Sequence, residues 1–408
     1  MNILLAVTGS ISAYKTFDIA RSFVNQGHLV RIILSPGALE FVKPQVYLYL
    51  GVEKVYLSND DFKFPSSEDH LPGTVLHVEL CKWADRFIVA PASANTLSKF
   101  AQGYAADLLT SIYLAFPKEK PAIIFPAMNN KMLTHPATLE NIKSIQKNSN
   151  VIIHGTLNGK LACGDEGEGK LLPVENIVTA SLYSNPFISK KAKKVMITTG
   201  ATVCPLDPVR YLTNSSSGIT GLHFAELALS KGMQVELICG IYATEKINYL
   251  DGLPGINITR VKTPFDMEKI VFHLLNDCHY FISAAAVSDF VFRPSQNKIK
   301  KKNLTDTLAI SPAPDILEQV IKKKTKNLKI VGFAAETDPS DKVILEKYMR
   351  KPVDLLVGTL ANNGLLGKKL EGFNQDSATY KIFKKKKNIF QGILSKKDLS
   401  EFIFKELE

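Results

Sequence analysis

Residues 2–34, NILLAVTGSISAYKTFDIARSFVNQGHLVRIIL, decide the fold of the first half of the chain. Residues 2–8 form an apolar run of strand length, and Gly9–Ser12 is a polar turn. Residues 13–25 carry apolar side chains at helical spacing, and residues 28–34 return to a strand pattern. This succession of strand, turn, helix and strand predicts the first unit of a parallel, doubly wound α/β sheet.

The same succession recurs in the second half. Residues 195–199 are predicted as a strand, which a long polar loop connects to a helix at 218–231 and a strand at 234–239. The break at Ser184–Pro186 and the lysine-rich run that follows it place a boundary near residue 188. We therefore expect two Rossmann-like domains, residues 1–188 and 189–408, with ligands outside the carboxyl ends of the strands.

The composition is typical of a soluble globular protein. The chain has 408 residues, of which 45% are hydrophobic and 22% charged. No apolar run approaches the ~20 residues of a membrane span, and the first strand leads directly into a glycine turn. We therefore expect no membrane segment or signal peptide and a cytoplasmic location. The five cysteines include no CxxC pair, which argues against a disulfide framework and a zinc site.

The net charge of +11 limits the choice of partners. Lysine runs such as 300–302 suit a solvated surface, phosphorylated small molecules or nucleic acid. The sequence has no helix-turn-helix, zinc-finger or aromatic-rich RNA motif, so phosphorylated small molecules are preferred. A nucleic-acid binder remains an alternative, and it predicts salt-sensitive retention of DNA or RNA.

Three polar loops follow predicted strands of the first half. Gly9–Ser12 offers amides and hydroxyls at a helix N-terminus, where a phosphate can bind, but it is not the GxGxxG of dinucleotide sites. Residues 90–96 (APASANT) follow the strand at 86–89, and residues 126–132 (PAMNNKM) follow the strand at 122–125. Three such loops indicate one binding site.

Two further residues of the first half are candidates for chemistry. His77 follows a strand-like Val75–Leu76 pair, and histidine is the residue type most often used for proton transfer near neutral pH. Cys163 lies in the glycine-rich segment 159–169, which we interpret as a mobile flap that closes over a substrate. A structural histidine and a buried thiol are the plainer alternatives.

The motifs GSISAYK (9–15), HVEL (77–80), PASANT (91–96), PAMNNKM (126–132) and LACG (161–164) resemble, in order and spacing, those of the homo-oligomeric flavin-containing cysteine decarboxylases. The resemblance implies a flavodoxin-like domain that uses FMN to oxidise a C-terminal cysteine thiol to a thioaldehyde. Carbon dioxide then leaves, and the enethiolate is reduced and protonated. It also implies that His77 is the essential base, Asn129 and Met132 bind substrate, and Cys163 is the final acid. The implied FMN contacts are Gly9, Ser10, Ser12, Ser35, Ser93, Asn95 and Thr96.

The second half has its own polar segments. DPVRYLTNSSSG (207–218) precedes a helix and suits a phosphate or carboxylate, although Ser217 as a simple N-cap fits equally well. SAAAVSDF (283–290), KIKK (298–301), PAPDIL (312–317) and GFAAET (332–337) follow. Together these segments resemble phosphopantothenate–cysteine ligase, so the whole chain resembles the bifunctional decarboxylase/ligase family of coenzyme A biosynthesis.

This second resemblance implies a CTP- and Mg²⁺-dependent ligation of 4'-phosphopantothenate with cysteine through an acyl-cytidylate. Lys298 then serves acyl-cytidylate formation, Asn214 its conversion, Arg210 binding of the acid substrate, and Asp289 the metal. Lys347 and Lys351 share one face of a predicted helix. The implied CTP contacts are Ser283, Ala284, Ala285, Asp289, Lys298, Pro314, Asp315, Ile316, Leu317, Phe333, Lys347 and Lys351.

Three places depart from the family pattern: Ala106 replaces an acid, Ile219 replaces a basic residue, and the segment 358–363 replaces Ala-Asn-Asp.

Two alternative functions remain open. One is a peptidyl-cysteine decarboxylase fused to an inactive nucleotide-binding module, and the other is a non-enzymatic regulatory flavoprotein. The family resemblance also implies a homo-oligomer, a dodecamer of decarboxylase trimers with paired ligase halves, and neither nucleic-acid nor membrane partners.

Overall fold

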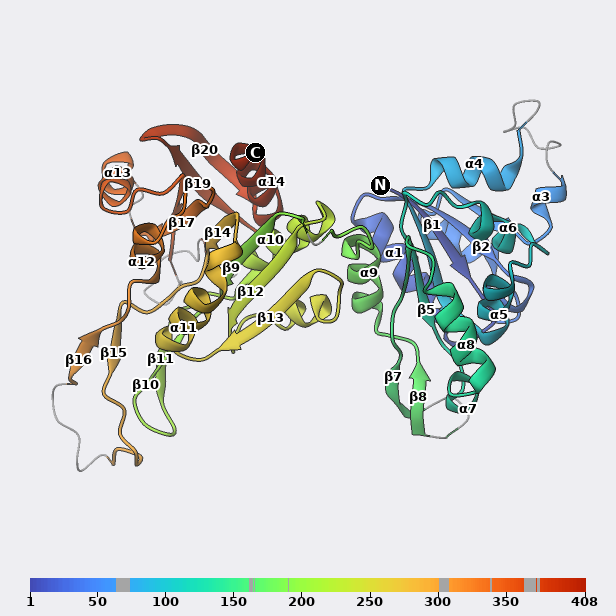
Figure 1. Cartoon of the computed structure of the whole chain (residues 1–408), viewed down its shortest axis with the longest axis horizontal. Helices are drawn as coiled ribbons and strands as arrows, with labels where there is room; N and C mark the ends of the chain where they lie inside the picture. The colour runs from blue at the N-terminus through green and yellow to red at the C-terminus, as the bar shows by residue number, and fades with distance from the viewer. Residues whose placement is uncertain are drawn as a thin grey trace. The chain divides into compact units, whose positions relative to one another are not determined.

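The computed structural model describes residues 1–63, 74–160, 164, 166–189, 191–300, 308–337, 340–362, 372 and 375–408. The chain divides into two compact units, Met1–Phe187 and Ile188–Glu408 (Figure 1). Cys163 and residue 363, which were considered from the sequence, lie outside the described residues. No helix of the described residues is long and apolar enough to cross a membrane.

The first unit is built on a parallel sheet in the order β3-β2-β1-β4-β5-β6. Ile3–Val7 of β1 are fully buried because helices cover both faces of the sheet. The strand order reverses between β1 and β4, the position where doubly wound sheets bind ligands. The strands are β1 (Asn2–Val7), β2 (Leu29–Leu34), β3 (Lys54–Leu57), β4 (Arg86–Ala92), β5 (Ala122–Pro126) and β6 (Val151–Ile153).

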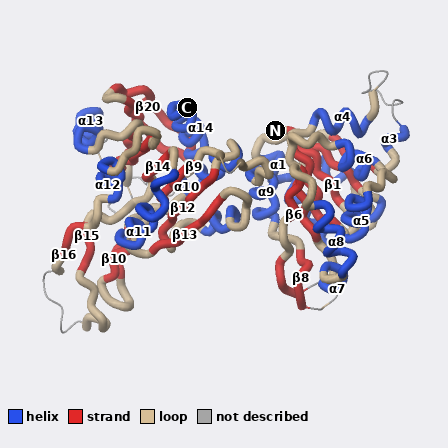
Figure 2. Tube along the Cα trace, in the orientation of Figure 1, coloured by secondary structure: helices blue, strands red, loops and turns tan. Residues whose placement is uncertain are grey.

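Helices and one hairpin complete this unit (Figure 2). Its helices are η1 (Ile11–Lys15), α1 (Thr16–Asn25), η2 (Pro36–Ala38), α2 (Pro44–Tyr49), α3 (Asp60–Lys63), α4 (Leu76–Trp83), α5 (Ala94–Gln102), α6 (Leu108–Ala115), α7 (Asn130–Leu133), α8 (Pro136–Ile145) and α9 (Val174–Tyr183). The hairpin is β7 (Leu157–Lys160) with β8 (Glu166–Lys170).

The second unit has the sheet order β13-β12-β9-β14-β17-β18-β19-β20, in which β19 and β20 are antiparallel. Its first six strands repeat the topology of the first unit, which confirms the predicted α/β fold with two doubly wound sheets. The strands are β9 (Lys194–Thr199), β12 (Gln234–Gly240), β13 (Ile256–Val261), β14 (Tyr280–Ser283), β17 (Lys329–Glu336), β18 (Leu355–Leu360), β19 (Ser377–Lys384) and β20 (Lys387–Ser395).

Helices cover the second sheet as two separate groups. Apolar side chains of α11 (Pro264–Leu274), α12 (Ile316–Lys322) and α13 (Asp341–Arg350) share one core. Phe404 of α14 (Lys396–Leu407) packs edge-on against Phe224 of α10 (Ile219–Ser230). The remaining elements are η3 (Glu245–Leu250), η4 (Leu275–Asp277), the hairpin β10 (Val203–Pro205)–β11 (Tyr211–Thr213) and the hairpin β15 (Phe290–Phe292)–β16 (Ile310–Pro312).

Four details differ from the sequence prediction. The first helix begins with a 3-10 turn, η1, and becomes α-helical only at Thr16, whose hydroxyl donates to the Ala13 carbonyl. His77 does not follow a strand but lies in the first turn of α4. The long loop after β9 contains a hairpin. Helix α10 is capped by Gly218 with φ +79° and no side-chain acceptor, so Ser217 is not its N-cap.

Candidate active sites

The three polar loops of the first unit lie at one edge of the sheet, because β1, β4 and β5 are neighbours. The Thr8 hydroxyl joins two of these loops: it donates to the Pro91 carbonyl (2.8 Å) and accepts from the Ser93 N–H (2.9 Å). The third loop is tied to β4, since the Ala127 N–H donates to the Ala92 carbonyl (3.0 Å). The sequence argument for a single site therefore agrees with the topology.

Serines begin helical turns around this edge. The Ser10, Ser35 and Ser93 hydroxyls accept backbone N–H groups of Ser12, Ala38 and Thr96. A hydroxyl that accepts in this way keeps its own hydrogen to donate to a ligand oxygen. A Cβ at Gly9 would meet the Cα of Gly37 at 3.0 Å, so the two loops approach closely at glycines. Amides and hydroxyls of this kind suit a single phosphate group.

The other predicted flavin and substrate residues lie in the same loops. Asn95 is exposed, whereas Thr96 is buried and its hydroxyl is 3.1 Å from that of Ser93, which favours a capping role for Thr96. Asn129 caps α7 by accepting the Lys131 N–H (2.8 Å), and Met132 is half exposed.

The β7–β8 hairpin packs on the loop that carries Asn129. The Met128 N–H donates to the Gly169 carbonyl at 3.0 Å. Gly169 has φ +124°, and a Cβ there would lie 2.1 Å from the Met128 carbonyl oxygen, so only glycine fits. The described arms of the predicted flap are therefore fixed to the candidate site, and the position of Cys163 lies between them in the sequence.

Asp61, which was not predicted from the sequence, forms two contacts with His77. The Asp61 carboxylate accepts from the His77 backbone N–H (3.1 Å) and lies 2.8 Å from its Nδ1. Helix α4 has no side-chain cap of its own, so Asp61 supplies an anion to its first turn. The same contact fixes the imidazole ring and leaves Nε2 for other partners. The signal was an Asp-Asp pair at 60–61, which sequence spacing alone does not connect to His77.

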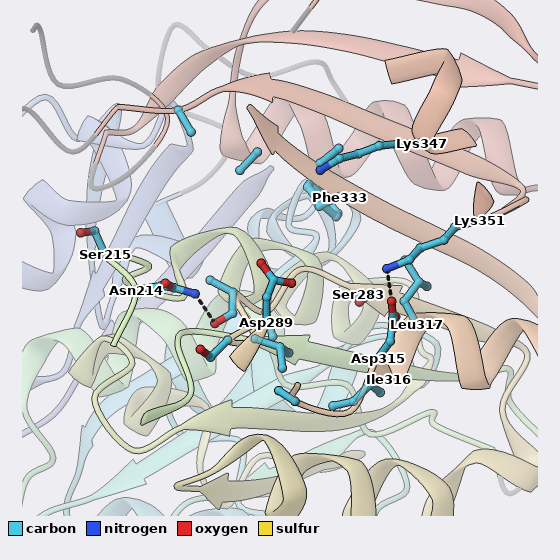
Figure 3. A pocket seen from close by; sticks show the side chains of 18 of the residues that line it. Asn214, Ser215, Ser283, Asp289, Asp315, Ile316, Leu317, Phe333, Lys347 and Lys351 are labelled. Carbon is cyan, nitrogen blue, oxygen red and sulfur yellow. Dashed lines mark hydrogen bonds and ion pairs between the residues drawn. The ribbon is translucent and has the colours of Figure 1, made fainter. Parts of the chain in front are cut away.

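The second unit contains a cleft of about 750 Å³ at the carboxyl ends of β14 and β17 (Figure 3). Most of the predicted CTP and catalytic residues line it, although they come from five separate segments. They are Asn214, Ser283, Ala285, Asp289, Pro314, Asp315, Ile316, Leu317, Phe333, Lys347 and Lys351. Ala284 lines an adjoining smaller cavity.

Two lysines of this cleft form ion pairs with acidic side chains. Lys347 forms an ion pair with Glu336 at the end of β17, and Lys351 forms one with Asp315 before α12 (the second is drawn in Figure 3). All four side chains are at least partly exposed, so these pairs orient the lysines more than they stabilise the fold. Glu336 was not predicted, although it belongs to the GFAAET segment.

Asn214 and Asp289 occupy the opposite side of the cleft from these lysines in Figure 3. The Asn214 amide donates to the Ala286 carbonyl at 3.1 Å, which fixes its orientation. Asp289 is exposed, and the described residues contain no group of three or more His, Cys, Asp or Glu that could bind a metal ion. A lone carboxylate binds Mg²⁺ in proteins when ligand phosphates supply the remaining oxygens, and Asp289 fits that role.

Lys298 and Arg210 lie outside the lining of the cleft. The Arg210 guanidinium donates to the buried Asp207 carboxylate (3.0 Å from Nε) and to the Ile299 carbonyl (2.9 Å). The Asp207 carboxylate also accepts the Ile299 N–H (3.2 Å). Asp207 and Arg210 thus hold both backbone groups of the residue after Lys298, and we call these contacts the Ile299 clamp. In this structure Arg210 positions the Lys298 segment.

The Asp207 carboxyl of the Ile299 clamp is stabilised in its ionised form. The Arg210 guanidinium keeps the pKa of the Asp207 carboxyl well below its usual range, and backbone N–H groups of Val209, Ile299 and Arg210 add to that effect. Asp207 therefore stays ionised throughout the neutral pH range. Lys298 itself is exposed at the end of this segment.

Fold and sites together define a two-unit α/β protein in which each unit has a polar site at the carboxyl edge of a doubly wound sheet, and the cleft of the second unit contains two lysines paired with acids. Residues 1–186 match the Flavoprotein family, and residues 190–408 match the DNA/pantothenate metabolism flavoprotein C-terminal domain. The coenzyme A biosynthesis bifunctional protein CoaBC of Bacillus subtilis is 34% identical over 100% of this chain and 96% of its own length. That of Escherichia coli K12 is 34% identical over 93% and 90%. The chain belongs to the CoaBC family of bifunctional coenzyme A biosynthesis proteins.

Solved structures resemble each unit separately. A PPC decarboxylase mutant complexed with pantothenoylaminoethenethiol is 32% identical, with a TM-score of 0.39, and covers 44% of this chain and 94% of its own. The C-terminal domain of a CoaBC protein is 24% identical, with a TM-score of 0.42, and covers 53% and 93%.

Proposed function

We propose that this chain carries out two consecutive steps of coenzyme A biosynthesis. Its second unit ligates 4'-phosphopantothenate to cysteine, and its first unit decarboxylates the product to 4'-phosphopantetheine. Membership of the CoaBC family over the full length supports this assignment. The single structural observation that carries it is the cleft, which gathers the predicted nucleotide residues from separate segments of the second unit.

In the ligation, the carboxylate of phosphopantothenate attacks the α-phosphate of CTP, and pyrophosphate leaves. Lys347 and Lys351, already oriented by Glu336 and Asp315, exchange these acids for phosphate oxygens. Lys298, placed by the Ile299 clamp, neutralises charge that develops on the phosphates. Asp289 would hold Mg²⁺, which would neutralise charge on the triphosphate. Asn214 then orients the acyl-cytidylate while the cysteine amine displaces CMP.

The decarboxylation takes place at the edge formed by β1, β4 and β5, where FMN supplies a two-electron oxidation of the thiol and its later reversal. Amides and hydroxyls of five residues would hold the phosphate and polar groups of the flavin: Gly9, Ser10, Ser12, Ser35 and Ser93. His77, oriented by Asp61, accepts a proton, and Asn129 and Met132 hold the substrate. Cys163 donates the last proton.

The alternatives are less well supported. A peptidyl-cysteine decarboxylase or a regulatory flavoprotein would have no use for the cleft of the second unit, in which acids orient two lysines. A nucleic-acid binder does not account for either site.

Three measurements test the proposal on the purified full-length protein. Its visible spectrum should show a bound flavin, and CTP, cysteine and phosphopantothenate together should release pyrophosphate. Phosphopantothenoylcysteine should then release carbon dioxide. A colourless protein would contradict the flavin assignment, and a lack of pyrophosphate would contradict the ligase assignment independently of the first result.

Cys163→Ser separates the two halves of the decarboxylation. We expect carbon dioxide release to continue while the product stalls as the enethiol, because the final proton donor is missing. Mass spectrometry of the product checks this outcome. Normal yields of the reduced thiol from the variant would remove Cys163 from this role.

Oligomeric state forms part of the same proposal. Decarboxylase units associated as trimers and ligase units as dimers would assemble twelve chains, and light scattering of the purified protein measures that mass. A monomeric, fully active protein would contradict it.

A further inference from the structure

Thr202 lies between β9 and β10, next to the cleft of the second unit, which we call the nucleotide cleft. It is outside the lining of the cleft, and its side chain is fully buried. Its neighbours in the chain, Ala201 and Val203, are buried and apolar. A buried hydroxyl is unfavourable unless it forms a hydrogen bond, so the contacts of this hydroxyl should explain why a threonine and not a valine occupies the position.

The hydroxyl of Thr202 binds the loop that follows β14. It accepts the backbone N–H of Ser288 at 3.1 Å, and Ser288 is itself buried. The next residue is Asp289, which is exposed and lines the cleft. The Asp289 carbonyl accepts the Ala313 N–H at 3.0 Å. The backbone of Asp289 is therefore fixed from both sides, and one of these sides depends on the Thr202 hydroxyl.

The backbone of Thr202 binds a second loop of the cleft. Its carbonyl accepts the Thr213 hydroxyl at 3.0 Å, and Thr213 directly precedes Asn214. Its N–H donates to the Ala286 carbonyl at 3.4 Å, and the same carbonyl accepts the Asn214 amide at 3.1 Å. Asn214 and Asp289 lie on one side of the cleft (Figure 3), and Thr202 contacts the segments that carry both of them.

We propose that Thr202 is a positioning residue of the ligation, which places Asp289 for the metal-bound triphosphate and Asn214 for the acyl-cytidylate. This inference rests on the ligase function proposed above, which gives these two residues their roles. A catalytic group displaced by about 1 Å can lower a rate about a hundredfold, so hydrogen bonds behind the cleft can control the reaction. The two contacts are separable, because the Asp289 loop is bound by the side chain of Thr202 and the Asn214 loop by its backbone.

Thr202→Val in the full-length protein tests the side-chain contact. Valine is β-branched like threonine but cannot accept the Ser288 N–H, whereas Thr202→Ser keeps the acceptor. We expect Thr202→Val to lower kcat for pyrophosphate release about tenfold and Thr202→Ser to stay within about threefold of the parent. The matched control is Thr263→Val, which removes a hydroxyl that likewise accepts a backbone N–H, that of Asp266 in α11, outside the cleft lining. It should leave kcat unchanged.

Thr213→Val tests the backbone contact, since it removes the hydroxyl that donates to the Thr202 carbonyl. In a single turnover with enzyme in excess, we expect CMP release to slow more than pyrophosphate release, because Asn214 acts after the acyl-cytidylate has formed. Thr202→Val should instead slow pyrophosphate release itself. Rapid-quench measurement of both products distinguishes the two variants. Equal slowing of both products in Thr213→Val would contradict the assignment of this contact to Asn214.

Two further measurements do not depend on turnover. Hydrogen exchange of the ligand-free protein should be faster in the peptide that contains Ser288 for Thr202→Val and unchanged for Thr263→Val. Calorimetry should show about threefold weaker binding of CTP to Thr202→Val with Mg²⁺ present, because Asp289 is displaced, and unchanged binding without the metal. Parental exchange and parental metal-dependent binding in Thr202→Val, or equal losses of kcat in Thr202→Val and Thr202→Ser, would overturn the proposal. A parent protein that forms no pyrophosphate would contradict the ligase function, whereas these two measurements would still decide whether Thr202 positions Asp289.

Discussion

The two sites differ in how they handle charge, although both lie at the carboxyl edge of a doubly wound sheet. The edge of the first unit offers backbone amides and serine hydroxyls, and in helix α4 of that unit the His77 Nδ1 lies 2.8 Å from the Asp61 carboxylate. The nucleotide cleft places Lys347 and Lys351 against acids and adds the Ile299 clamp nearby. One phosphate monoester that stays bound can be held by neutral donors, whereas a triphosphate whose charge is redistributed during reaction requires cations. The acids keep these cations oriented until a substrate replaces them.

The strongest test of this difference removes a cation from the second unit. Lys298→Gln should lower acyl-cytidylate formation by on the order of 10³-fold, since it deletes a charge that stabilises the transition state. Decarboxylation of supplied phosphopantothenoylcysteine should remain within twofold of the parent rate, or about 0.4 kcal/mol. Pyrophosphate release and carbon dioxide release measure the two activities. Parallel loss of both would show that the sites are not independent.

Low pH should lower the free energy of unfolding of the first unit more than that of the second. Burial lowers the pKa of His154 from 6.5 to about 4 in the first unit, where the ring stacks on Phe125. The unfolded chain therefore binds this proton at a higher pH than the folded chain does. The unit is predicted to lose up to about 3 kcal/mol as the pH falls from 6.5 to 4, and this contribution is fully present above 6.5.

His154→Gln should remove this acid sensitivity of the first unit while leaving the second unit unaffected. Differential scanning calorimetry of the full-length protein between pH 7 and pH 4.5 measures it. The same dependence on pH in parent and variant would exclude His154 as the cause.

The smallest expected effect concerns Asp61. Asp61→Asn keeps an oxygen that accepts the His77 backbone N–H but removes the negative charge beside the ring. We expect decarboxylation to fall about tenfold, or about 1.4 kcal/mol. Thermal stability should change little, because the amide oxygen still accepts the His77 backbone N–H. A loss of thermal stability with an unchanged decarboxylation rate would show that Asp61 only caps helix α4.

Sequence reasoning predicted that three polar loops share one edge of the first sheet, and the strand order agrees, because each loop follows a strand directly. Apolar runs such as 86–89 and 122–125 indicate strands, and parallel strands bring the loops that follow them to one edge. The hairpin after β9 was missed because its strands are only three residues long, and one of them, Tyr211–Thr213, has no buried residue. Such strands carry no alternation of apolar and polar residues.

Partners distant in sequence could not be predicted. Asp61 is 16 residues from His77, and their contact depends on how α3 packs beside α4. Helix α4 has no capping side chain next to its start, because the anion at its first turn comes from this distant aspartate. The Val75–Leu76 pair therefore indicated a strand. Thr202 was overlooked because Thr213 and Ser288, which it contacts, are 11 and 86 residues away in the sequence.

The Ile299 clamp has a consequence for how the sequence of this segment can vary. Both of its contacts use the backbone of residue 299, which donates its N–H to Asp207 and accepts at its carbonyl from Arg210. Side-chain identity at that position is therefore unconstrained by the clamp, and nineteen of the twenty amino acids provide the same donor and acceptor. Proline alone lacks the N–H. A position beside the proposed catalytic lysine is in this way closed by the clamp to proline alone.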